Sequence, residues 1–566
     1  MQRLRIPFAR NISAMAYFNG DLLAFVDGDR GTLNYASTDR PENIGVINYA
    51  SPEEFKNAKA LLIQGRIIRY ALSNEIRTIK IHNGQAKLIK KTRLEELGCI
   101  IGIVFFNDLY FISDINGQVI VIDSNTSKTR AWNVNAKLNS MTLHRAETGD
   151  CLLFLDGDSR AVYAYDFNGN HLFSITVPHE GATSLASLYC KDKKEEKLYI
   201  SYVHRTWEIY DNTDPELKKG NKLNIELDRN ALNVFIEPLD YNLKNFNNGS
   251  NVCISGGYRS VFKYFTMLLP RNDIKKELTN LHPNVRMSVP VNTERQKVLS
   301  LEIIGQAEGK MLKDEDGEDI VEFNLKDRHF DREIILFGYK ADLELYNIRY
   351  FIKASPFPVS FPKHIRRYLN IDRKLDMHRQ ELKNIAAEII ESIPEKDRNS
   401  IINVVRAIRE YVYTKLEYRY NSRYTKPLQT LKDGEGTCGK YTELLLGLMK
   451  LCRVPCRSVG DYKIPDYKLE YGILNTVCRP DYDHVWIEFY IPDIGWVPME
   501  SSSDHLTGKH NRFFAALPWL HIESSRTKKR MEAVIPETWR RTDKRFNFSD
   551  YFVHETEITV VQNLLD

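Results

Sequence analysis

The sequence contains no run of about 18 apolar residues, the length that a membrane-spanning helix needs. Its first residues are basic but lack a continuous apolar core of signal-peptide length, so we expect a soluble, cytoplasmic protein. An excess of one charge is also lacking, because 79 Lys and Arg against 75 Asp and Glu leave a net charge of +4. Without a strong overall field, binding to nucleic acid or to a membrane surface is not expected.

Cysteine is scarce, with eight residues scattered over 566 positions. This spacing is not that of a disulfide scaffold, so in a reducing compartment each thiol fills a core, binds a metal or reacts. Cys452 and Cys456 form a C-x3-C pair with Cys478 further on, but no ordered second pair follows. We therefore expect these three cysteines to be core residues and predict no metal site.

Several cofactor and catalytic motifs are missing: a Walker A loop, HExxH, an EF-hand loop and GxSxG. Residues 434–439 match G-x-G-x-x-G formally, but a helical segment and a proline-containing linker precede them instead of a strand. A dinucleotide site needs that strand, so we predict no cofactor.

What remains is an ordinary globular composition, 43% hydrophobic and 27% charged, long enough for three to four domains. Changes along the chain from strand-like to helical patterns predict three domains. We expect a β-propeller-like domain at residues 1–283, a small β-sandwich at 284–358 and an α+β domain at 359–566.

The propeller prediction rests on a repeat. Short β-like runs end in polar turns at Asn83, Asn125, Asn168 and Asn212, which lie 42, 43 and 44 residues apart. Such a period, with about four strands per unit, is typical of propeller blades. Weaker units near Asn34 and Lys263 bring the expected number to about six blades. The alternative is an irregular β-sandwich with accidental spacing, and the fold alone would assign no function.

The C-terminal third begins with helical periodicity. Residues 380–393 and 399–418 both carry apolar residues at spacings of three and four, which predicts two amphipathic helices. A glycine-rich turn at residues 433–436 then leads to Cys438 and a segment that is apolar nearly all round, as in a buried helix. With Thr437 as N-cap, Cys438 would lie in the first helical turn, where the dipole favours a thiolate nucleophile.

A base for this cysteine is predicted in the segment DHVWIEFYIPDIGWVPMESSSD. His484 lies in one alternating strand, and Glu500 ends the next, beyond a turn at Pro492, Asp493 and Gly495. If the turn has an odd number of residues, both side chains lie on one face of the hairpin. Glu500 would then orient His484, and His484 would activate Cys438. With an even turn, Asp504 or another carboxylate would be needed; Asp483 is a further candidate.

These segments together resemble the transglutaminase-like superfamily of papain-type cysteine enzymes over roughly residues 400–505. The resemblance rests on AIREYVYTKLEY, on GEGTCGKYTELLLGLMKLCRVPCRSVGDY, and on His-x-Trp followed by Gly-Trp-Val-Pro. It implies that Cys438 is the nucleophile, His484 the base and Glu500 the orienting acid. The family usually has Asp at that last position. A β-sandwich often precedes such cores, as predicted here.

The resemblance implies acyl transfer at an amide through a thioester, on a peptide or protein substrate. Hydrolysis is the first expectation, since water needs no second site. An amide-forming transferase and a non-catalytic scaffold stay open as alternatives. The propeller would recruit a substrate or a protein partner. We place His505, His510 and His521, which follow the core, in loops or on the surface.

Overall fold

The structure of the protein is a computed structural model, and the statements below concern the residues that it describes. These are residues 4–6, 9, 11–40, 43–47, 55–82, 85–146, 149–178, 181–190, 195–203, 207–210, 222–225, 234–239, 251–268, 284–314, 317–326, 328, 334–353, 355–419, 425–464, 477–478, 483–504, 512–526, 531–534 and 552–564. None of the helices in these ranges is long and apolar enough to cross a membrane.

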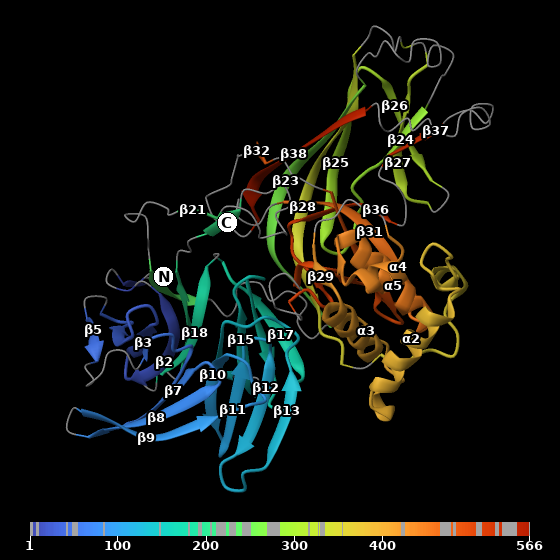
Figure 1. Cartoon of the computed structure of the whole chain (residues 1–566). Coiled ribbons are helices and arrows are strands. Elements are labelled where there is room, and N and C mark those ends of the chain that lie inside the picture. Colours follow the sequence, from blue (N-terminus) through green and yellow to red (C-terminus); the bar gives the residue numbers. More distant parts are fainter. Residues whose placement is uncertain are drawn as a thin grey trace.

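The N-terminal half consists of small antiparallel sheets of four strands each (Figure 1). Glycines at positive φ close two of the hairpins, Gly117 at 85° and Gly169 at 79°, as the asparagine-glycine turns predict. The first two sheets are β2 (Ile12–Asn19), β3 (Leu22–Asp27), β4 (Thr32–Ser37) and β5 (Ile44–Ile47), then β6 (Ala60–Gln64), β7 (Ile67–Leu72), β8 (Glu75–His82) and β9 (Gln85–Arg93). The next two are β10 (Ile100–Phe106), β11 (Leu109–Asp114), β12 (Gln118–Asp123) and β13 (Thr129–Asn133), then β14 (Ser140–Ala146), β15 (Gly149–Asp156), β16 (Ala161–Tyr165) and β17 (His171–Thr176).

A fifth sheet closes these four into a ring. It joins the N-terminal β1 (Leu4–Arg5) to β22 (Phe235–Leu239), β19 (Glu195–Tyr202) and β18 (Ala182–Cys190). The strands β2, β6, β10, β14 and β18 contact one another in that order, and β18 contacts β2. The hydrophobic side chains between neighbouring sheets form separate buried clusters around this ring. A further pair, β20 (Trp207–Tyr210) and β21 (Lys222–Ile225), stands apart as a two-stranded sheet.

The number of repeat units differs from the prediction. Among the described residues, five four-stranded sheets form the ring, not about six. The unit predicted near Lys263 belongs to β23 (Val252–Leu268), which pairs with β28 (Ile335–Tyr350) and β38 (Phe552–Asn563) outside the ring. The segment near Lys263 is a strand, as predicted, but a local strand signal does not specify which sheet the strand joins. The predicted turns at Asn83 and Asn212 lie outside the described residues.

Long strands lie between the ring and the helices in Figure 1. They form a six-stranded sheet in the order β25 (Gln296–Gly305), β28, β23, β38 and β32 (Val477–Cys478), with β35 (Ala516–Leu517) paired to β28. A four-stranded sheet packs nearby: β26 (Glu308–Lys313), β27 (Asp319–Asn324), β24 (Asn284–Ser288) and β37 (Met531–Val534). Strands from all three predicted domains meet in the six-stranded sheet, so boundaries at 283 and 358 do not separate its strands.

The C-terminal part also contains an α+β unit. Its sheet has the order β34 (Gly495–Met499), β33 (Asp483–Ile491), β31 (Cys456–Lys463) and β36 (His521–Arg526). The helices are α1 (Lys363–Arg366), η4 (Arg367–Leu369), α2 (Gln380–Ser392), η5 (Glu395–Asp397), α3 (Ile401–Lys415), α4 (Pro427–Asp433) and α5 (Cys438–Leu451). A parallel pair, β29 (Glu417–Tyr418) and β30 (Glu435–Gly436), connects their ends.

The predicted helices at 380–393 and 399–418 correspond to α2 and α3. Their apolar faces, with α5 and residues such as Trp486 and Phe489 of β33, form the largest of the buried clusters. Tyr462 of β31 and Ile522 of β36 belong instead to the cluster of the long strands. The small sheet therefore lies between the helices and the long strands, with apolar packing on both sides.

One arginine joins the ring to the C-terminal half. Arg349 of β28 is 3% exposed and its guanidinium donates to the Tyr163 hydroxyl at 3.1 Å and to the Asn135 carbonyl at 2.6 Å. It also pairs with the Asp156 carboxylate at 3.3 Å and donates to the Arg512 carbonyl at 2.7 Å. Asp156 is fully buried, and Ser159 and Tyr163 also donate hydrogen bonds to its carboxylate.

Removing this cation is expected to destabilise the protein strongly. Arg349→Met leaves the buried Asp156 carboxylate without its cation, and breaking such a pair usually costs about 3–5 kcal/mol. Unfolding in urea, followed by tryptophan fluorescence, measures the loss as a lower midpoint. Arg259→Met is the matched control, because Arg259 and Asp342 form a pair at 2.5 Å on the surface, where such pairs contribute little. Equal midpoints for the two variants would contradict the prediction.

Candidate active site

Cys438 is the first residue of α5, as the sequence predicts. Gly434, at φ 67°, ends α4 in the left-handed region, and the short strand β30 then leads into the new helix. Thr437 occupies the N-cap position, but its side chain makes no capping hydrogen bond. The thiol of Cys438 is half-exposed at the start of a helix that is otherwise largely buried. The first backbone N–H groups of a helix have no partner within the helix, so this end of α5 offers hydrogen-bond donors.

The hairpin of β33 and β34 brings His484 and Glu500 to one face. Ile491 pairs with Gly495, so three residues lie in the turn, an odd number. The Nε2 atom of His484 lies 2.6 Å from Oε1 of Glu500, and both side chains are fully buried. Because a carboxylate only accepts hydrogen bonds, Nε2 carries the proton, and in the neutral ring Nδ1 is the acceptor.

The second oxygen of Glu500 is held by backbone. Its Oε2 accepts hydrogen bonds from the N–H groups of Ser502, at 2.8 Å, and Ser503. One oxygen of Glu500 therefore accepts a hydrogen bond from the imidazole, and the other accepts two from backbone N–H groups. Together these bonds fix the plane of the carboxylate. The extra methylene of glutamate, relative to the aspartate usual in the family it resembles, is accommodated in this position.

Thr442 of α5 connects the elements that carry the three predicted residues. Its hydroxyl donates to the carbonyl of Val485, at 3.3 Å, and lies 3.0 Å from the hydroxyl of Ser501. Val485 follows His484, Ser501 follows Glu500, and Thr442 lies one helical turn after Cys438. The side chain is 2% exposed. Sequence reasoning missed this residue, because a threonine in an apolar helix carries no distinctive signal.

The alternative carboxylate, Asp504, has other partners. It forms an ion pair with Arg409 of α3 at 2.5 Å and accepts the Phe513 N–H at 2.8 Å. Arg409 also donates to the carbonyl of Glu500 at 3.4 Å. Burial raises the pKa of Asp504, while the Arg409 charge acts in the opposite direction. Asp504 thus supports the backbone behind Glu500. The side chain of Asp483, the other alternative, lies outside the described residues.

A second imidazole–carboxylate pair lies beside His484. His521 of β36 is fully buried, and its Nδ1 hydrogen-bonds with Oδ2 of Asp461, while its ring centre lies 5.6 Å from that of His484. Burial lowers the pKa of His521, which favours the neutral ring. The expectation that His521 lies in a loop or on the surface is wrong, because β36 pairs with β31 and takes His521 into the sheet. His505 and His510 lie outside the described residues.

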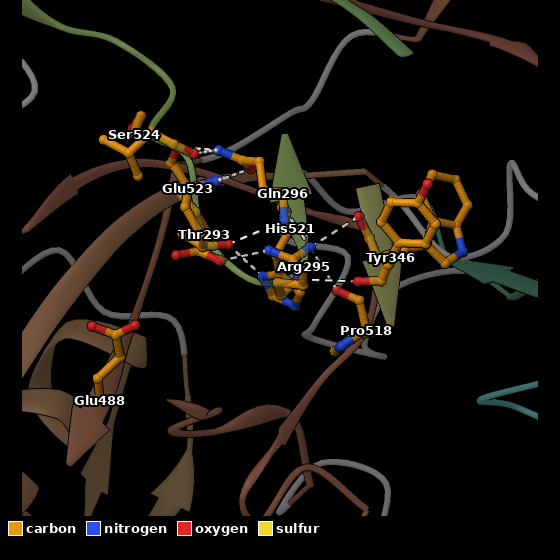
Figure 2. A network of polar contacts seen from close by, with 12 residues as sticks. Thr293, Arg295, Gln296, Tyr346, Glu488, Pro518, His521, Glu523 and Ser524 are labelled. Atoms are coloured by element: carbon orange, nitrogen blue, oxygen red, sulfur yellow. Dashed lines mark hydrogen bonds and ion pairs between the residues drawn. The ribbon is translucent and has the colours of Figure 1, made fainter. Parts of the chain in front are cut away.

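A buried arginine fixes the strand that carries His521. Figure 2 shows the Arg295 guanidinium among the backbone carbonyls of Pro518, His521 and Tyr346. It also forms an ion pair with Glu523 at 2.7 Å, and both side chains are 2% exposed. The side-chain amide of Gln296 makes two hydrogen bonds with the backbone of Glu523. Its nitrogen donates to the Glu523 carbonyl, and its oxygen accepts from the Glu523 N–H. This network joins the long strands to the edge of the small sheet.

Cys452 and Cys456 are buried, whereas the side chain of Cys478 lies outside the described residues. Burial raises the pKa of both Cys452 and Cys456 to about 12, and their thiols face the carbonyls of Ala386 and Leu446. Among the described residues, no group of three His, Cys, Asp or Glu side chains is placed to hold a metal ion.

Cys438 therefore begins a helix that packs against the strand carrying His484, and His484 is hydrogen-bonded to Glu500. The model of the transglutaminase-like superfamily matches residues 385–501. This part of the chain is therefore a transglutaminase-like domain. A search of curated proteins finds no matching relative.

Solved structures share parts of the chain at low similarity. A protein of Cytophaga hutchinsonii, described as a candidate cysteine protease, is 15% identical, with a TM-score of 0.34, and the match covers 54% of this chain and 100% of that one. Glutaminyl cyclase of Myxococcus xanthus is 12% identical (TM-score 0.28, covering 42% and 96%). Virginiamycin B lyase of Staphylococcus aureus is 13% identical (TM-score 0.23, covering 40% and 73%).

Proposed function

We propose that the protein is a cysteine-dependent acyl enzyme that attacks an amide bond of a peptide or protein. The observation that carries the proposal is the buried His484–Glu500 hydrogen bond of 2.6 Å, on strands that Thr442 connects to the helix of Cys438. A buried imidazole oriented by a carboxylate is the arrangement that activates a nucleophile.

The reaction has two stages. The Cys438 thiol passes its proton to Nδ1 of His484, and the sulfur attacks the amide carbonyl. Backbone N–H groups in the first turn of α5 stabilise the oxyanion. The carbon–nitrogen bond then breaks, the imidazolium gives its proton to the leaving amine, and a thioester remains on Cys438. Water, activated by His484, attacks the thioester and releases the acid. Throughout, Glu500 stabilises the charged imidazole.

Water is the first acceptor that we propose, since it needs no binding site. With an amine in its place, the same thioester gives a new amide, and the enzyme is a transferase. A scaffold without catalysis is the third candidate. The buried His484–Glu500 pair favours catalysis over a scaffold, because a fully buried imidazole–carboxylate pair has no evident packing advantage over apolar side chains.

We further propose that the ring of five sheets is a five-bladed β-propeller. The order of contacts between the first strands and the sealing of the last sheet by β1 support this interpretation. Its role in recruiting a substrate or a protein partner stays a prediction.

The proposed chemistry is tested by intact mass. The full chain is incubated with a peptide library, quenched in acid and examined for an added acyl mass that neutral hydroxylamine removes. We expect the adduct on Cys438 and unmodified Cys452 and Cys456, whose buried thiols are inert. If an added labelled amine removes the adduct and the label appears in the product, the enzyme is a transferase. If an unlabelled carboxylic acid is released, the enzyme is a hydrolase. Absence of any thioester, with every peptide left intact, would overturn the proposal.

Thr442 provides a prediction about positioning. Thr442→Val keeps the shape of the side chain but removes the hydroxyl, which costs about 1 kcal/mol of stability. Displacement of the reacting groups by about 1 Å can lower the rate by about 10²-fold, so we expect kcat to fall by about tenfold to a hundredfold. Thr442→Ser keeps the hydroxyl and restores most of kcat. Equal kcat values for the two variants would show that the hydroxyl does not position the site.

A further inference from the structure

A cleft of about 550 Å³ opens along one face of α5. On its other sides are β31, Val485 of β33 and the segment 367–375. The contributing residues of α5 recur at helical spacing and so form one stripe: Gly439, Thr442, Glu443, Leu446 and Lys450. Gly439 directly follows Cys438, so the cleft reaches the residue next to the proposed nucleophile.

Gly439 is not required by packing within the protein. A Cβ atom placed there would meet only the Thr437 hydroxyl, at 3.9 Å, an ordinary contact distance. Its φ is not in the left-handed region. Gly439 is the second residue of α5, where alanine would also fit, so neither helix geometry nor packing requires glycine there. Close approach of a ligand to the backbone at the mouth of the cleft explains it.

The charges of the cleft are separated along the helix. Near Cys438, the half-buried Glu443 makes no hydrogen bond or ion pair with the described residues, and Asp372 lies close enough to interact with it. Burial and Asp372 raise the pKa of Glu443 to about 7, against the opposing charge of Lys374. A bound cation would relieve this repulsion and stabilise the ionised carboxylate.

The far end of the cleft is basic. Lys450 lies there in the last turn of α5, without an ion-pair partner among the described residues, and Arg367 also lines the cleft. Arg457 contributes less free charge, because it forms an ion pair with Glu488 at 2.6 Å and stacks 4.2 Å from the Trp496 ring. The acidic and basic ends are therefore distinct.

We propose that this cleft is the substrate groove and binds an extended peptide with a basic side chain near the reacting bond and an acidic group about three residues away. Glu443 and Lys450 are seven helical residues apart, about 10 Å, and an extended peptide covers that distance in about three residues. The inference rests on the proposed function, because it assigns the groove to the substrate of Cys438.

Binding is measured separately from catalysis, with the full chain carrying Cys438→Ala so that no peptide is consumed. The probes are fluorescein-labelled peptides with lysine and glutamate three residues apart, in both orders. Matched peptides carry two lysines, two glutamates, or norleucine and glutamine. Fluorescence anisotropy should show one lysine–glutamate order binding at least about tenfold more tightly than the uncharged peptide.

Three variants test the contacts. Glu443→Gln and Lys450→Gln should each remove most of that advantage and leave binding of the uncharged peptide unchanged. Gly439→Ala should weaken binding of every peptide and raise the urea midpoint slightly, since alanine favours the helix. A lower midpoint with unchanged binding would mean that Gly439 serves the fold and does not open the groove.

The outcomes separate this inference from the proposed function. Uncharged or like-charged peptides that bind as tightly as the lysine–glutamate peptides would overturn the charge pattern. A thioester on Cys438 in the wild-type chain, with no peptide binding that depends on Glu443 or Gly439, would overturn the groove and leave the acyl enzyme standing. Peptide binding without any thioester would instead remove the proposed chemistry.

Discussion

Cys438→Ala is expected to abolish turnover and thioester formation while the protein stays folded. The side chain is half-exposed at a helix start, and alanine is the residue that helices favour most, so replacement creates no buried cavity. Activity on a responsive peptide and the urea midpoint measure the two effects. We expect no detectable product above the uncatalysed rate and a midpoint equal to that of the wild type.

Cys452→Ala is the matched control for this variant. Its thiol is buried and packs towards the Ala386 carbonyl, so the change should lower stability and leave the rate per folded molecule unchanged. Thiol reactivity provides an independent check by peptide mapping. The half-exposed Cys438 should react with iodoacetamide faster than the buried Cys456 in the folded protein. Full turnover by Cys438→Ala would refute the proposed nucleophile.

Glu500→Gln is expected to impair catalysis at least as much as Glu500→Ala. The N–H groups of Ser502 and Ser503 both donate to the Oε2 position, so the amide oxygen of glutamine must take that place. The amide NH₂ group then faces Nε2 of His484 and forces this nitrogen to accept, which moves the ring proton to Nδ1. His484 could then no longer take the proton of Cys438, and a loss of at least about 10³ in kcat/KM follows.

His484→Ala sets the scale for this comparison, because it removes the base entirely and should also cost at least about 10³. Imidazole ¹⁵N NMR identifies the protonated ring nitrogen, Nε2 in the wild type and Nδ1 in Glu500→Gln. Glu500→Ala does not force either tautomer of His484, so we expect a smaller loss of kcat/KM. If Glu500→Gln kept nearly full activity with Nε2 protonated, the orienting role of Glu500 would be wrong.

The transglutaminase-like domain could be predicted because its signals are local. Periodicity in residues 380–393 and 399–418 predicts α2 and α3, and the turn before Cys438 predicts the start of α5. The relation of His484 to Glu500 depends only on the parity of a three-residue turn. Each of these features depends on neighbouring residues, so distant contacts have little effect on it.

The N-terminal half was predicted less completely for the opposite reason. A repeat of about 43 residues indicates stacked four-stranded units, but the number of units depends on where the ring closes. Closure is decided by β1 pairing with β22, more than 200 residues away, and by β23 joining β28 and β38 instead. A segment that forms a strand does not by itself specify its pairing partners, so the sequence could not decide between the two sheets.

The sequence by itself determined the elements that present a cysteine, an imidazole and a carboxylate, because helix periodicity, strand alternation and turn length are properties of neighbouring residues. The tertiary structure alone decided their surroundings: His521 and Asp461 beside His484, Arg409 against Asp504, and Thr442 between helix and hairpin. These contacts join residues 59 to 95 positions apart. Their pairing depends on how whole strands and helices pack. Because these polar groups are buried away from water, each needs a hydrogen-bond partner within the protein.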